Sequence, residues 1–199
     1  MRSSTCKIEN GTNDLEAILK ECEKVAAYCG LTEKQCLHLR LLCEEIDGML
    51  PHIIDEFSGD FWIDMNDCIC KVNASIVIPE ISSSKKEELI AVARNKKNSA
   101  AVGIVGKIRD AIENLLLISK ENDSHYPTPL VLDFGTGYCD GVDYSYLWSL
   151  EQYRSTVNNA EKTEEWDELE KSVIASVADD VIVGVKGNRA NIVIVKKFA

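Results

Sequence analysis

The sequence predicts an α+β fold, in which helices cover one face of a mixed or antiparallel sheet. Two observations lead to this prediction. Apolar residues recur at helical spacing along several long segments, and they alternate with polar residues in two pairs of short segments. With 199 residues, the chain is long enough for a single domain with one sizeable core, so residues 1–199 are expected to form one domain.

Helical periodicity defines the predicted helices. The first precedes Gly30, which suits the left-handed position that ends many helices. The second opens with Thr32 and Gln35, a capping-box pair, and Pro51 should kink or end it in its last turn. Met49 falls on the apolar stripe of this helix. The predicted helices span residues 13–29, 32–53, 87–93, 99–118, 143–157 and 164–178.

Alternating apolar residues define the predicted strands. Asn66-Asp67 and Lys186-Gly187-Asn188 are typical turn residues between two pairs of strands. The strands are expected at residues 6–9, 59–64, 68–78, 181–185 and 191–195. The segment 120–180, with two predicted helices, is interpreted as an insertion within the domain.

Composition limits the function classes. Apolar residues make up 45% of the chain and charged residues 28%, as in ordinary globular proteins. The net charge of −11 argues against nucleic acid or an anionic membrane as a partner, because both attract a basic surface. The sequence has no apolar run long enough for a membrane span, and residues 1–14 lack the apolar core of a signal peptide. We therefore expect a cytoplasmic protein.

Four of the eight cysteines recur at seven-residue intervals, at Cys22, Cys29, Cys36 and Cys43. A metal cluster or a set of disulfides is one interpretation, but Cys-x-x-Cys spacing is absent. Cysteines on the apolar side of a helix behave as small hydrophobic residues. We expect these four to be reduced, largely buried and free of metal.

The strongest functional signal lies between Leu31 and Ile81, where a capped helix with Glu44-Glu45 precedes a strand hairpin. This order resembles the opening of the GHKL (histidine-kinase-like) ATPase fold, and more narrowly the bacterial anti-sigma-factor serine kinases. The resemblance implies a two-layer α/β sandwich. It also implies Glu-Glu-x-x-x-Asn on the helix, where Glu orients the attacking group and Asn holds magnesium. Here Glu45 remains as a candidate catalytic remnant, and Met49 stands in the Asn position.

The exchange at Met49 changes the chemistry that this resemblance implies. A thioether is a poor ligand for magnesium, which prefers oxygen. The adenine-reading Asp-x-Gly of the family is replaced by Pro79-Glu80, and proline donates no backbone hydrogen bond. The alternative interpretation of Glu45 is a partly exposed residue beside the core.

A Gly-x-x-Gly element after the polar stretch 79–98 resembles a third motif of the family. Gly103, Gly106 and Lys107 would contact the phosphates if a nucleotide binds, together with Glu45 and Met49. Each glycine in a helix lowers its stability by about 1 kcal/mol relative to alanine, so we expect a structural or functional reason for these two. The alternatives are close packing on the sheet, or a helix that begins later than residue 99.

Two features of the insertion suggest functions of their own. Residues 130–141, LVLDFGTGYCDG, resemble the first motif of S-adenosylmethionine-dependent methyltransferases, but the βαβ units which that fold needs do not follow. The loop Asp133 to Gly141 is therefore expected to be a glycine-rich turn. The next segment carries aromatic residues on several faces, which is typical of an interface, although core packing is the alternative. These aromatic residues are Tyr144, Tyr146, Trp148 and Tyr153.

These observations predict a regulatory protein that binds a protein partner, with ATP binding weakened or lost. The resemblance implies a sigma factor or its antagonist as the partner, and a homodimer is the other expected association. The alternative is a working ATP-dependent serine kinase or ATPase, and a methyltransferase is a remote alternative. No resident cofactor or metal is expected; ATP and magnesium would be ligands only of the kinase or ATPase.

Overall fold

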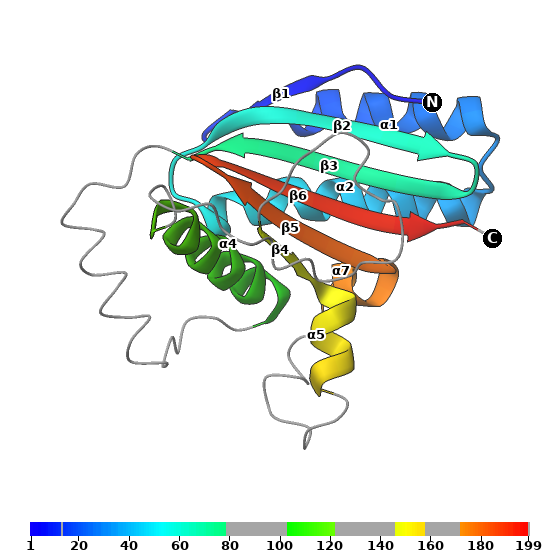
Figure 1. Cartoon of the computed structure of the whole chain (residues 1–199). Helices are drawn as coiled ribbons and strands as arrows, with labels where there is room; N and C mark the ends of the chain where they lie inside the picture. Colours follow the sequence, from blue (N-terminus) through cyan, green and yellow to red (C-terminus); the bar gives the residue numbers. More distant parts are fainter. Residues whose placement is uncertain (13, 79–102, 122–145, 158–171, 199) are drawn as a thin grey trace.

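The computed structural model describes residues 1–12, 14–78, 103–121, 146–157 and 172–198. Its centre is a six-stranded sheet with the strand order β1-β2-β3-β6-β5-β4, in which every pair is antiparallel (Figure 1). The strands are β1 Cys6–Glu9, β2 Ser58–Asn66, β3 Ile69–Val77, β4 Tyr146–Ser149, β5 Asp180–Lys186 and β6 Arg189–Lys197. The α+β class expected from the sequence is confirmed.

The helices form a second layer. In Figure 1, α1 and α2 run behind the sheet, and α4 packs against β5 and α2. The described helices are α1 Leu15–Cys29, α2 Glu33–Ile53, α4 Gly103–Glu121, α5 Leu150–Val157 and α7 Val173–Val177. This layering is compatible with an α/β sandwich.

Two strand hairpins that are far apart in sequence lie side by side in the sheet. Strand β3 pairs with β2 on one side and with β6 on the other. The β2–β3 turn consists of Asp67 and Cys68, one residue later than expected, and Asp67 has a φ of 50°. Asp tolerates this left-handed conformation better than most residues, which explains the position of the turn.

One face of the sheet supplies the core. Alternate side chains of β2, β3, β5 and β6 point toward the helices, as the period of two in a strand requires. The fully buried members are Phe61, Ile63, Cys70, Val72, Ile76, Val181, Val183, Val185, Ala190, Ile192 and Ile194. On the opposite face, β2 and β3 carry polar groups that are hydrogen-bonded: Trp62 Nε1 donates to Asp64 Oδ2 at 2.7 Å, and Arg189 Nη1 donates to Ser75 Oγ at 3.1 Å. On β5 and β6 the same face carries the apolar residues Ile182, Val193 and Val195.

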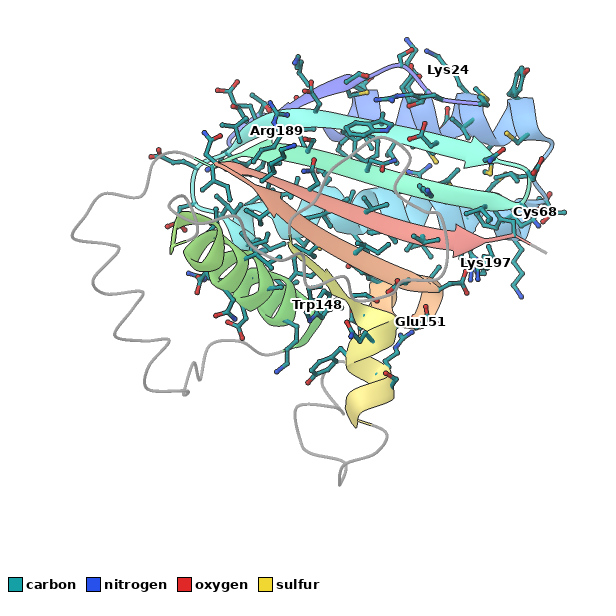
Figure 2. All side chains as sticks on the ribbon, viewed as in Figure 1. Lys24, Cys68, Trp148, Glu151, Arg189 and Lys197 are labelled. Carbon is teal, nitrogen blue, oxygen red and sulfur yellow. The ribbon has the colours of Figure 1, made fainter. Side chains whose placement is uncertain are left out.

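The helix predicted at residues 143–157 is wrong in its first half. Tyr146–Ser149 forms strand β4, paired with β5, and helix α5 begins only at Leu150. Aromatic residues favour strands as well as buried helices. The carboxylate of Asp180 on β5 fixes the junction, since it accepts hydrogen bonds from Ser149 Oγ at 3.1 Å and from Glu151 N at 2.9 Å. Figure 2 shows Trp148 and Glu151 at this junction.

Other boundaries differ less. The helix predicted at 99–118 is described from Gly103 to Glu121, and residues 99–102 lie outside the described residues. Of the helix predicted at 164–178, the structure describes α7 over Val173–Val177, and residues 164–171 lie outside it. The short helix expected at 87–93 also lies outside the described residues.

Candidate functional site

Helix α2 holds Glu45 and Met49 in fixed positions. Its start is a complete capping box, in which Thr32 Oγ1 accepts from Gln35 N at 3.4 Å and Gln35 Oε1 accepts from Thr32 N at 2.9 Å. Pro51 lies within the last turn, as the sequence predicts. The apolar stripe of the helix, which includes Leu42, Ile46 and Leu50, is buried in the core and so determines which face of α2 points inward.

Met49 belongs to the hydrophobic core. Its side chain is only 3% exposed, and the neighbouring Ile46 and Leu50 are buried in the same cluster. Glu45, one turn earlier, is half-buried. The place that a magnesium-binding Asn would occupy is therefore filled by a packed thioether. Half-burial of Glu45 agrees both with a site remnant and with a residue beside the core.

The glycines of α4 have separate structural reasons. Gly103 has a φ of 72°, a left-handed conformation that favours glycine, and the described helix begins there. Gly106 is buried where α4 packs against the sheet and α2. Close packing and a helix that begins after residue 99, the two alternatives to phosphate contact, both agree with this arrangement.

Lys107 lies against an aromatic side chain of α5. Its Nζ is 5.3 Å from the ring centroid of Tyr153, a distance at which a cation is attracted to the ring. Tyr153 is in turn 6.3 Å from Trp148, between ring centroids, and both pack against the core. Packing therefore accounts for part of the aromatic character that the sequence interpretation assigned to an interface. Tyr144 lies outside the described residues.

The structure brings the two motif-bearing helices together. Glu45 and Met49 lie on α2, Gly103, Gly106 and Lys107 lie on α4, and the two helices contact each other. The residues that replace the adenine-reading motif, Pro79-Glu80, lie outside the described residues. So does the glycine-rich loop at 133–141.

The sequence interpretation missed another acidic residue of α2, Asp47. It is half-buried, and burial raises the pKa of its carboxyl group, with a further contribution from the negative charge of Asp14. Raised pKa values of this kind occur where a carboxylate loses water without gaining a partner charge. The signal in the sequence was an acidic residue between two apolar positions of α2, Ile46 and Met49.

The described part of the chain contains no group of three His, Cys, Asp or Glu side chains that could hold a metal ion. Within the same residues, no helix combines the length and apolar character needed to cross a membrane.

Comparison of the chain with models of known protein families, with curated proteins and with solved structures finds no match. The interpretation of the site therefore depends on its geometry and on the residues themselves.

Proposed function

We propose that this protein is a regulatory protein of the anti-sigma-factor serine kinase type, which acts by binding a protein partner and has weak or no nucleotide binding. The main observation that supports this proposal is the burial of Met49. The order of elements supports it: helix α2 precedes the β2–β3 hairpin, and helix α4 and the β5–β6 hairpin follow. This is the order on which the resemblance rests.

The burial of Met49 argues against a magnesium site on physical grounds. Magnesium exchanges its water only for hard oxygen ligands in near-octahedral geometry. An oxygen ligand at this position would have to lie where the present side chain is 3% exposed. A polar group left unpaired at such a position costs about 1–3 kcal/mol.

The charge of the chain favours a protein partner over nucleic acid. A net charge of −11 repels polyanions and attracts a basic protein surface. A sigma factor or its antagonist is the partner class that the resemblance implies, and self-association is the other form that this function could take. Such a protein would act in the cytoplasm.

Titration calorimetry with magnesium-ATP tests the proposal. We expect no binding in the micromolar range for the wild-type protein. A modest gain of binding in Met49→Asn would support the interpretation of Glu45 as a remnant of a nucleotide site. Met65→Asn is the matched control, since Met65 is buried to a similar degree on β2, at 4% exposure. It should lose stability like Met49→Asn without gaining ATP affinity. Micromolar binding by the wild-type protein would contradict the proposal.

A working serine kinase or ATPase is the second candidate. The left-handed Gly103 at the described start of α4 favours it, because a helix start can present backbone N–H groups to a phosphate. In that case the wild-type protein should release phosphate from magnesium-ATP, and Glu45→Gln should abolish the release.

A further inference from the structure

Helices α1 and α2 form a helical hairpin around which the four regularly spaced cysteines are arranged in two pairs. A short connection joins the helices, and Gly30, with a φ of 63°, ends the first of them. Short connections of this kind join antiparallel helices. Cys29 and Cys36 lie near the connection, and Cys22 and Cys43 lie farther from it. Positions seven residues apart share one side of a helix, so each pair can meet across the hairpin.

The structure shows that the more distant pair is in contact. Cys22 and Cys43 are 3% and 0% exposed, both belong to the same buried cluster, and each thiol is the group that most strongly shifts the pKa of the other. Both are free thiols. Cys36 is differently engaged, since its Sγ donates to Leu31 O at 3.5 Å.

The interaction shifts the pKa values of the two thiols in opposite directions. The neighbouring Cys43 thiol lowers the pKa of the Cys22 thiol, although burial and the negative charge of Glu23 oppose this effect. The Cys22 thiol, together with burial, raises the pKa of Cys43 well above its ordinary value. Cys22 is therefore the partner that more readily becomes a thiolate, which is the reactive form of cysteine.

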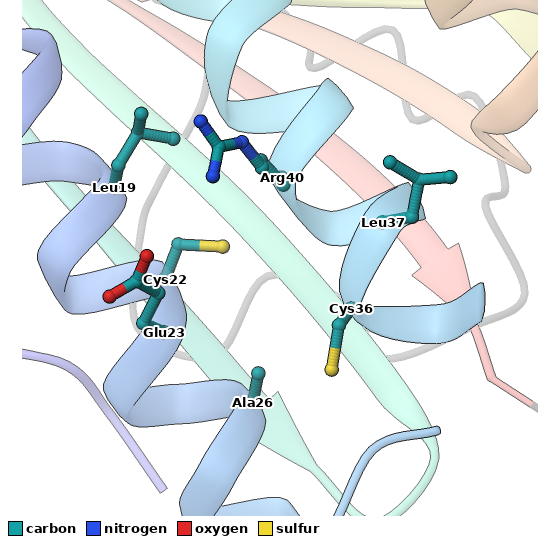
Figure 3. Close-up of a pocket in the computed structure, with 7 residues that line it drawn as sticks. All are labelled: Leu19, Cys22, Glu23, Ala26, Cys36, Leu37 and Arg40. Carbon is teal, nitrogen blue, oxygen red and sulfur yellow. The ribbon is translucent and has the colours of Figure 1, made fainter. Parts of the chain in front are cut away.

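A hollow on the hairpin gives small molecules a route to Cys22. It has a volume of about 170 Å³ and lies between α1 and α2 (Figure 3). Cys22 and Cys36 both form part of its wall, and the exposed Glu23 and Arg40 also line it. The remaining lining residues are Leu19, Ala26 and Leu37. A water molecule occupies roughly 30 Å³ in the liquid, so a peroxide fits within this volume. The positive charge of Arg40 acts to lower the pKa of Cys22, and the larger effect of the negative charge of Glu23 acts to raise it.

We propose that Cys22 is a peroxide-reactive thiol and that Cys43 resolves it, forming a reversible disulfide across the α1–α2 hairpin. The Cys22 thiolate attacks one oxygen of hydrogen peroxide, the O–O bond breaks, and the leaving hydroxide takes a proton to become water. The Cys43 sulfur then attacks the sulfenic acid on Cys22, and a second water leaves with the Cys43 proton. Two thiols are oxidised to one disulfide, and one peroxide is reduced to two waters.

Peptide mapping of the full-length protein after treatment with hydrogen peroxide tests this proposal. Free thiols are blocked before digestion with trypsin and an Asp-directed protease, which separates Cys22 in residues 21–24, Cys43 in 41–46, and Cys68 with Cys70 in 67–71. We expect a loss of two hydrogen atoms and a link between 21–24 and 41–46. A thiol reductant should reverse it.

Three variants make the result specific. Cys22→Ser and Cys43→Ser should each abolish the link, and Cys43→Ser should leave a sulfenic acid on Cys22 that dimedone traps. Cys68→Ser is the matched control, because Cys68 is exposed on the β2–β3 turn, and the link should persist. A principal link to residues 35–40 or 67–71, or no link at all, overturns the proposal. If a serine variant fails to fold, the wild-type map still decides, because it identifies the linked peptides directly.

Discussion

The helical hairpin α1–α2 and the strand hairpin β2–β3 each contain an interior glycine, and the surroundings of these two glycines are opposite. A Cβ atom added to Gly48 of α2 meets no other atom within 4 Å, and this position is exposed. A Cβ atom added to Gly59 of β2 would lie 2.2 Å from Ser75 O and 2.9 Å from Cα of Ile76. The outer side of the helical layer therefore has room for side chains. The strand pair is limited by its own backbone, which no rotamer change can relieve.

The largest effect is expected for Gly59→Ala. The new methyl group overlaps the backbone of β3, so the strands must separate, and we expect a loss of about 3 kcal/mol in the free energy of unfolding. Urea unfolding followed by circular dichroism measures this change. Ser58→Ala, at the exposed neighbouring position, is the control and should stay within about 0.5 kcal/mol of the wild type. Similar stabilities for the two variants would show that β2 and β3 are less closely paired around Gly59 and Ile76 than in this structure.

The same exchange in the helical hairpin should have the opposite sign. Gly48→Ala removes a flexible residue from the interior of α2 without a steric cost, and a gain of about 1 kcal/mol is expected from helix propensity. Gly30→Ala is the matched control, because a φ of 63° makes alanine unfavourable there. Thermal unfolding should therefore shift upward for Gly48→Ala and downward for Gly30→Ala. A downward shift for both would mean that Gly48 is constrained by a neighbour.

The smallest effect concerns charge in the helical layer. Because the pKa of Asp47 is raised in the folded protein, its ionised form opposes folding at neutral pH. Asp47→Asn should remove this cost and stabilise the protein slightly at pH 7. As the pH falls through the raised pKa, the wild-type carboxyl group takes up a proton and the advantage should vanish.

Urea unfolding at neutral pH and near pH 3 measures this dependence, since the ordinary pKa of Asp is about 3.9. Glu16→Gln, in the first turn of α1, is the control for a simple loss of negative charge. An advantage for Asp47→Asn that stays constant over this range would contradict the assigned cause.

Local signals explain most of what the sequence predicts correctly. Three features of the helices depend on only a few adjacent residues, and the structure confirms all three. They are the capping box at Thr32, the left-handed Gly30 and the last helical turn at Pro51. The burial of Met49 follows from the apolar stripe of α2 and is also confirmed. Of the four regularly spaced cysteines, Cys22 and Cys43 are buried as expected, and the other two are half-buried.

Features that depend on distant residues could not be predicted in this way. Strand β4 carries aromatic residues that suit a helix or a strand, and its pairing with β5 decides between them. Ser149, directly before α5, caps the helix locally by accepting from Gln152 N, but the second acceptor of this cap is Asp180, about thirty positions away. The pKa of Asp47 depends on burial and on the approach of Asp14. In the candidate site, the contact between α2 and α4 is equally a property of the folded chain.

The place of β6 between β3 and β5 has a consequence for how the chain acquires its structure. The ribosome completes α1, α2 and the β2–β3 hairpin long before it produces β6 at residues 189–197. Until then, the side of β3 that later pairs with β6 carries unsatisfied N–H and C=O groups, which can template pairing with another chain. Contacts between such distant segments also slow folding. The nascent protein is therefore most vulnerable to aggregation just before its last strand is made, and a chaperone that shields β3 would act in that interval.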